Sequence, residues 1–103
     1  MEMNEYQRQA KKTLRPECDN LEYLALGLNG EAGEVADKIK KVIRGDGELN
    51  EVTLMSELGD VLYYVAMLAQ NIGFDLEYVA WMNNRKLENR VKNGTLKGSG
   101  DNI

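Results

Sequence analysis

The chain has 103 residues, a length that fits one domain and leaves no room for a second. It contains no histidine and one cysteine, and 17 acidic residues outnumber 13 basic ones to give a net charge of −4. This composition excludes Ser-His-Asp and Cys-His catalysis, zinc sites built on imidazole, and an internal disulfide. The acidic balance argues against nucleic acid as a partner, because proteins that bind it need a basic surface.

The sequence shows no targeting or membrane signal. The residues from Met1 to Tyr6 are too polar for a signal peptide, and no apolar run approaches the ~18 residues of a membrane helix. The lone thiol of Cys18 fits a reducing compartment. We therefore expect a cytoplasmic protein with no membrane partner.

The first half of the chain reads as a short helix followed by a long one. Residues 4–14 are compatible with a helix that ends before Pro16, because a residue preceding proline disfavours helical backbone angles. Asp19 or Asn20 then caps a long helix that runs to a glycine-rich turn at Gly45. One apolar stripe follows this helix at steps of three and four residues, formed by Leu21, Leu24, Leu28, Ala32, Val35, Ile39 and Val42.

The second half predicts another long helix over residues 51–72 and a last helix over residues 76–91. Gly73 stands where a glycine ends a helix, and Asp75 can cap the next one. No strand alternation is present, so the predicted fold class is all-α, with four helices and short connections. Residues 1–93 form the predicted domain, and residues 94–103 are expected to be a flexible tail or, alternatively, a small lid over substrate.

The length of the two central helices has a consequence for assembly. A helix of ~24 residues spans ~36 Å, whereas a compact domain of this size has a radius of gyration of only ~13 Å. We therefore expect long antiparallel helical hairpins that assemble into a homo-oligomeric bundle. The first long helix also contains glycines that indicate close packing, a bend or backbone beside a ligand, namely Gly27, Gly30 and Gly33.

Four acidic residues fall in two pairs, Glu31 with Glu34 and Glu57 with Asp60, and each pair shares a helix face. Glu31 lies ~14 residues before the turn and Glu57 ~12 after it, so an antiparallel hairpin brings the pairs together near mid-helix. Two unit charges ~4 Å apart repel by roughly 4 kcal/mol at an effective dielectric of 20. Such a cluster therefore holds a cation, is partly protonated, or does not converge.

An all-oxygen ligand set without histidine or thiolate favours a hard cation, Mg²⁺ with Mn²⁺ as an alternative. Acids at this spacing are also common on solvated helix faces, so a surface role without any metal stays open. The same holds for Lys86 and Arg90, which lie four residues apart on the last predicted helix and could form a solvated basic face.

The segments Glu31-Ala32-Gly33-Glu34 and Glu57-Leu58-Gly59-Asp60 resemble the E-x-x-E … E-x-x-D signature of the MazG-like nucleotide pyrophosphohydrolases. The residues between the two segments fall within the usual gap of that family. Farther along, the chain is similar to the family's N-x-x-K-x-x-x-R element at Asn83, Lys86 and Arg90. The resemblance covers roughly residues 20–93.

This resemblance implies an all-α enzyme, a dimer or tetramer, that hydrolyses a nucleoside triphosphate to the monophosphate and pyrophosphate and so clears it from the nucleotide pool. It implies that the four acids bind Mg²⁺ and form the catalytic set, with one of them or a neighbouring acid orienting the attacking water. It further implies that phosphates or sugar are held by Lys38, one turn beyond Glu34, and by Asn83, Lys86 and Arg90.

Two alternatives to this function stay open. In the first, the acids are surface groups of a non-enzymatic helical module for oligomerisation or regulation. In the second, the same fold acts on a different pyrophosphate substrate, such as a phosphoribosyl nucleotide. No motif defines a base pocket, so the sequence does not separate these substrates.

Overall fold

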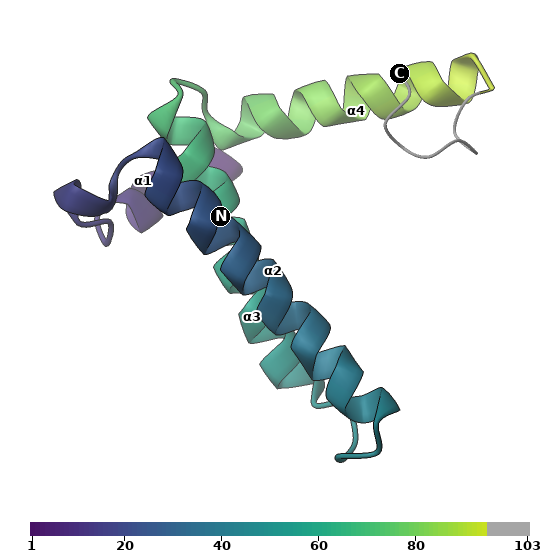
Figure 1. Cartoon of the computed structure of the whole chain (residues 1–103). Helices are drawn as coiled ribbons and strands as arrows, with labels where there is room; N and C mark the ends of the chain where they lie inside the picture. Colours follow the sequence, from purple (N-terminus) through teal and green to yellow (C-terminus); the bar gives the residue numbers. More distant parts are fainter. Residues whose placement is uncertain (95–103) are drawn as a thin grey trace.

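A computed structural model describes residues 1–94, so the predicted tail lies outside the described residues except for Gly94. The described part of the chain contains no strand and consists of helices joined by short connections (Figure 1). The all-α prediction with four helices is therefore confirmed. These helices are α1 (Met3–Lys11), α2 (Leu21–Ile43), α3 (Glu51–Asn71) and α4 (Leu76–Lys92), with a short 3-10 helix, η1 (Pro16–Cys18), after α1.

The helix boundaries follow from local polar groups. The side chains of Asn20, Asn50 and Asp75 each accept a hydrogen bond from the backbone N–H three residues on, at 2.8, 3.0 and 2.8 Å, and so begin α2, α3 and α4. Gly73 ends α3 with φ at +92°, a left-handed angle that glycine adopts without strain.

The first helix is shorter than predicted. It ends at Lys11 because Thr13 turns back on the chain, with its backbone N–H and its hydroxyl both donating to the carbonyl of Ala10, at 2.9 and 2.7 Å. This three-residue hydrogen-bonding pattern tightens the last turn and closes the helix.

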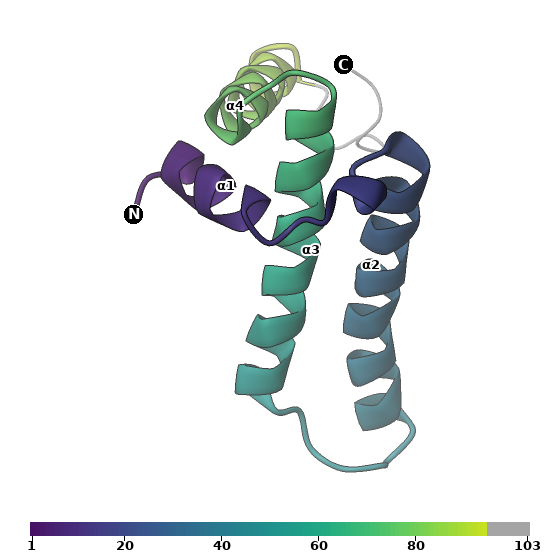
Figure 2. The same ribbon diagram turned by 90° about the vertical axis from the view of Figure 1, so that its left-hand side faces the viewer.

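Helices α2 and α3 lie side by side and antiparallel, joined at the far end of the molecule (Figure 2). Leu24 of α2 and Met67 of α3 are fully buried where the two helices meet α1. Gly27 allows a close approach between the helices, since a Cβ there would overlap the ring of Tyr64. Close packing therefore explains Gly27, but Gly30 and Gly33 meet nothing within 4 Å in this chain.

Helix α4 leaves the end of the hairpin and runs away from it as a rod (Figure 1). It packs on α1 and on the C-terminal end of α3, and little of its remaining length touches the hairpin. The radius of gyration is 16.2 Å, well above the ~13 Å of a compact domain of this size. The chain is thus open rather than compact, with extents of 42 × 41 × 28 Å, which agrees with the long helices predicted from the sequence.

This shape leaves many apolar side chains in contact with solvent. Leu26 of α2 is 73% exposed, Met55 of α3 64% and Trp81 of α4 51%. On α3, Met55, Leu58 and Leu62 share one face at helical spacing and are all exposed. Contiguous exposed apolar surface on this scale is typical of a protein–protein interface.

Among the described helices, α3 is long and apolar enough to cross a membrane by length and composition, with a mean hydropathy of 1.3. The core helices of water-soluble proteins pass the same test. Three acidic residues, Glu51, Glu57 and Asp60, lie within this helix, and ionised carboxylates are costly inside a bilayer.

Candidate metal centre

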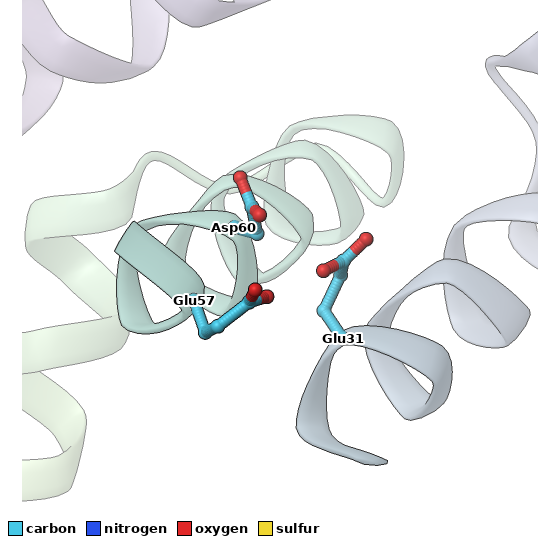
Figure 3. A group of neighbouring side chains, drawn as sticks. All are labelled: Glu31, Glu57 and Asp60. Atoms are coloured by element: carbon cyan, nitrogen blue, oxygen red, sulfur yellow. The ribbon is translucent and has the colours of Figure 1, made fainter. Parts of the chain in front are cut away.

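Three of the predicted acidic residues converge between the two long helices. Glu31 projects from α2 toward Glu57 and Asp60 on α3 (Figure 3). One carboxylate oxygen from each residue lies within 4.8 Å of the others. The i, i+3 spacing of Glu57 and Asp60 places both on one face of α3, and the antiparallel register puts Glu31 opposite them.

The size and chemistry of this cluster fit a divalent cation. Oxygen ligands lie about 2.0–2.1 Å from Mg²⁺ and 2.3–2.6 Å from Ca²⁺. Two ligand oxygens on opposite sides of one ion are therefore about 4.2 Å apart for Mg²⁺ and about 5 Å for Ca²⁺. Oxygens that lie within 4.8 Å of one another are therefore close to the spacing that a single divalent cation requires.

The electrostatics of the cluster agree with this geometry. Partial burial raises the pKa of Glu31 above its ordinary value, and the negative charges of Asp60, Glu57 and Glu34 raise it further. A hydrogen bond with Asp60 also favours the protonated form of Glu31. Glu31 thus resists ionisation beside these acids, and a bound cation would relieve the repulsion.

Glu34 lies apart from the other three acids. It is exposed on α2 and is not among the residues whose oxygens gather within 4.8 Å. It is close enough for its charge to act on Glu31. From this position Glu34 can either bind a metal directly or contact a water molecule beside it.

Lys38 lies against the cluster. Its ammonium nitrogen is 3.8 Å from a carboxylate oxygen of Glu57, and both side chains are largely shielded from solvent, at 29% and 17% exposed. The neighbouring cations Lys40 and Lys41 pair instead with Asp37, at 3.5 and 2.9 Å. Lys38 is therefore the lysine of α2 that the fold directs toward the acidic residues of α3.

The predicted phosphate-binding residues of the last helix lie elsewhere. Lys86 is about 15 Å along α4 from its start, and Asp60 is about 17 Å along α3 from its end. Because α4 runs away from the hairpin (Figure 1), these separations along the two helices add distance between Lys86 and Asp60 instead of bringing them together. Asn83 and Lys86 line an open groove of about 680 Å³ beside α4. Arg90 is not one of the residues that line it, and its side chain is buried, at 9% exposed.

The sequence did not single out two other polar residues of this groove, Arg85 and Asn89. Arg85 sits over the ring of Trp81, with 5.1 Å from the guanidinium carbon to the ring centroid. The sequence could have indicated Asn89, because Asn89 follows Lys86 by three residues and residues three apart share a helix face. Trp81 and its stacked neighbour Tyr78 are half-exposed and thus are not core residues.

Acidic residues that face each other across an antiparallel helical hairpin define an all-α protein with a candidate carboxylate-based cation site. The comparison with protein families identifies the class more closely: residues 19–95 match the MazG nucleotide pyrophosphohydrolase domain, and the chain belongs to that family. Family membership supports an activity of the nucleotide pyrophosphohydrolase type, and members are typically metal-dependent.

A curated relative from Mycobacterium phage L5, the "Gene 37 protein", is 45% identical over 93 residues. The alignment covers 84% of this chain and 82% of the phage protein. The name of that relative states no activity. No solved structure matches the chain significantly.

Proposed function

We propose that this protein hydrolyses a nucleoside triphosphate to the monophosphate and pyrophosphate in a Mg²⁺-dependent reaction. The observation that carries the proposal is the convergence of Glu31, Glu57 and Asp60 from two helices, in a member of the MazG nucleotide pyrophosphohydrolase family. A reaction that draws on the nucleotide pool also agrees with the cytoplasmic location expected from the sequence.

In this reaction water attacks the α-phosphorus, and the bond from that phosphorus to the oxygen bridging the α- and β-phosphates breaks. Pyrophosphate leaves with the electron pair of that bond, and a proton of the water passes to a base. Bound Mg²⁺ would supply charge neutralisation at the phosphates and a lowered pKa for water. Mn²⁺ suits the same oxygen ligands.

The residues of the hairpin divide these tasks. Glu31, Glu57 and Asp60 hold the cation. Glu34, one turn from Glu31 and exposed, is our candidate for the acid that orients water and accepts its proton. Lys38 neutralises Glu57 before substrate binds and can turn its ammonium to a phosphate oxygen afterwards.

Asn83 and Lys86 lie on α4, which runs away from the hairpin that carries the acidic cluster of their own chain (Figure 1). We therefore assign them to the cluster of a neighbouring copy in a homo-oligomer, a dimer or a tetramer. The exposed face of Met55, Leu58 and Leu62 beside the cluster supplies apolar surface for that assembly. Residues from two chains then meet at each site.

The test is pyrophosphate release from a panel of ribo- and deoxyribonucleoside triphosphates with Mg²⁺, together with melting temperatures with and without Mg²⁺. We expect release from at least one nucleotide and a rise in the melting temperature with Mg²⁺ alone. Glu57→Gln and Asp60→Asn should each reduce release by more than about 100-fold, since even changes outside the ligand shell cost 10–100-fold.

Glu22→Gln is the matched control, because Glu22 is an exposed acid in the first turn of α2, more than two turns from Glu31. It should keep both activity and the effect of Mg²⁺. Full activity in the Glu57 and Asp60 variants would contradict the assignment of the site. Failure of every nucleoside triphosphate, with the Mg²⁺ effect intact, would contradict the substrate and favour another pyrophosphate compound.

A further inference from the structure

The start of α4 is held by side chains of another helix. The first N–H groups of a helix have no partner within it. The N–H of Leu76 donates to the side-chain oxygen of Gln7 at 2.9 Å, and the N–H of Glu77 donates to that of Asn4, also at 2.9 Å. Asn4 and Gln7 lie three residues apart on one face of α1. Helix α1 thus acts as an external cap for α4.

Gln7 also binds the end of the preceding helix. Its amide nitrogen donates to the carbonyl of Ala66 in α3 at 3.0 Å and to the carbonyl of Phe74 in the connection at 3.2 Å. The side chain is 5% exposed, and both amide hydrogens and the oxygen are used. One buried amide therefore links α3, the α3–α4 connection and the first turn of α4.

We infer that Asn4 and Gln7 are positioning residues that set the direction of α4 and thereby the place of Asn83 and Lys86. Helix α4 is supported mainly at its base (Figure 1), so a change in its angle is amplified along its length. A rotation of about 10° at the base moves Lys86, about 15 Å away, by roughly 2–3 Å. Displacements of 1 Å at a catalytic site can cost 100-fold in rate.

The positioning helix lies outside the part of the chain that matches the family. Helix α1 spans Met3–Lys11, whereas the family match begins at residue 19. The orientation of the substrate-binding helix in this chain is thus determined by a segment before the family domain. The consequence for substrate binding rests on the proposed function; the consequence for the angle of α4 does not.

The angle is measured first, without any assay of activity. Spin labels are attached in a Cys18→Ser background at Ser56→Cys on α3 and Glu88→Cys on α4, both exposed positions. Labelled protein is diluted with unlabelled protein, so that electron–electron double resonance reports distances within one chain. The parent protein should give one narrow distance, and Gln7→Met, which keeps the size of the side chain but forms none of its hydrogen bonds, should shift or broaden it.

Gln9→Met is the matched control, because it makes the same exchange on the exposed face of α1 and should leave the distance unchanged. Asn4 gives a second and milder test. Asn4→Ala removes the acceptor for Glu77 and should broaden the distance, whereas Asn4→Asp keeps an acceptor at the helix N-terminus and should restore it. If the Gln7→Met variant does not fold, the distances measured in the two Asn4 variants test whether α1 orients α4.

The functional part is tested by kinetics with the unlabelled variants. Gln7→Met and Asn4→Ala should raise KM for the nucleoside triphosphate by about 10-fold or more while changing kcat less. The rise in melting temperature with Mg²⁺ alone should persist, because the carboxylates lie on the hairpin. Unchanged distances in both variants would overturn the inference, and so would a shifted distance with an unaltered KM. If the protein hydrolyses no nucleotide, the distances still decide whether α1 orients α4.

Discussion

Lys38 and Glu57 face each other across the hairpin, with 3.8 Å between the ammonium nitrogen and a carboxylate oxygen. The same carboxylate belongs to the cluster that Glu31 and Asp60 complete. A fixed positive charge therefore stands beside the position proposed for a bound cation. A bound cation would compete with Lys38 for Glu57, and the ammonium of Lys38 would then turn to a phosphate group.

This competition predicts opposite effects of removing Lys38 on the two ligands. Lys38→Met should tighten the binding of Mg²⁺ by about 2–5-fold, because partly exposed ion pairs contribute roughly 0–1 kcal/mol. It should also raise KM for the nucleoside triphosphate, because a phosphate contact is lost. Calorimetric titration with Mg²⁺ and steady-state kinetics measure the two effects.

Lys40→Met is the control for this prediction, because Lys40 pairs with Asp37 on the same helix rather than with the cluster. It should leave both quantities near their original values. Weaker Mg²⁺ binding in Lys38→Met would show that the ammonium supports the metal ligands instead of competing with the metal.

The stability of the metal-free protein should depend on pH through Glu31. Burial and the charges of Asp60, Glu57 and Glu34 raise its pKa above the ordinary 4.5, and Lys38, paired to Glu57, is the facing cation. A raised pKa in the folded state means that Glu31 favours folding while it is protonated. This contribution is fully present below pH 4.5 and is lost as the pH rises through the raised pKa.

The Glu31→Gln variant lacks this pH dependence of stability, so a comparison with the parent protein measures the contribution of Glu31. In metal-free buffer with a chelator, the variant should have a larger free energy of unfolding than the parent protein above the raised pKa. The difference should shrink as the pH falls toward 4.5. Urea unfolding at a series of pH values measures it, and a parent protein that is the more stable of the two at pH 8 would contradict the prediction.

A site shared between chains predicts that two inactive variants restore activity when mixed. Asp60→Asn loses the acidic cluster, and Lys86→Ala loses the cation of α4. In a mixed oligomer, the intact cluster of one chain meets the intact α4 of the other. We expect either variant alone to be inactive and the mixture, after unfolding and refolding together, to recover a fraction of the parent activity, up to about one quarter for a randomly mixed dimer.

Mixing Asp60→Asn with Glu57→Gln is the matched control, because both changes damage the same cluster and no intact site can form. No pyrophosphate release above that of the single variants is expected there. If the mixture of Asp60→Asn with Lys86→Ala stays as inactive as this control, Lys86 does not act on the cluster of a neighbouring chain.

The contact between Gly27 and Tyr64 predicts a difference between two glycines of α2. Gly27→Ala places a methyl group that overlaps the ring of Tyr64, and overpacking of this kind costs about 1–3 kcal/mol. Gly30→Ala meets nothing within 4 Å and should stabilise the isolated chain by about 0.5–1 kcal/mol through helix propensity. Urea unfolding measures both.

The double variant Gly27→Ala/Tyr64→Leu should regain part of the stability that Gly27→Ala loses, because the smaller side chain removes the overlap. Equal effects of alanine at Gly27 and Gly30 would contradict this account of the packing. A loss of stability in Gly30→Ala would indicate that Gly30 is covered when the chains assemble.

The sequence alone determined the helices and the pairing of acids. Caps such as Asn20 and Asp75, the stop at Gly73 and the apolar periodicity are local signals, and local signals fix helix boundaries to within a few residues. The i, i+3 spacing of Glu57 with Asp60 is likewise local. The symmetry of the acids about the turn was enough to predict that carboxylates from both long helices meet.

Only the tertiary structure decided which acids converge and where the last helix points. Glu34 shares the spacing of the other acids, but the exact rotation of α2 against α3 leaves it outside the group. The direction of α4 depends on Gln7, whose partners lie 59 to 69 residues away in the chain. Contacts between residues so distant leave no periodic trace in the sequence, because each partner is an ordinary backbone group.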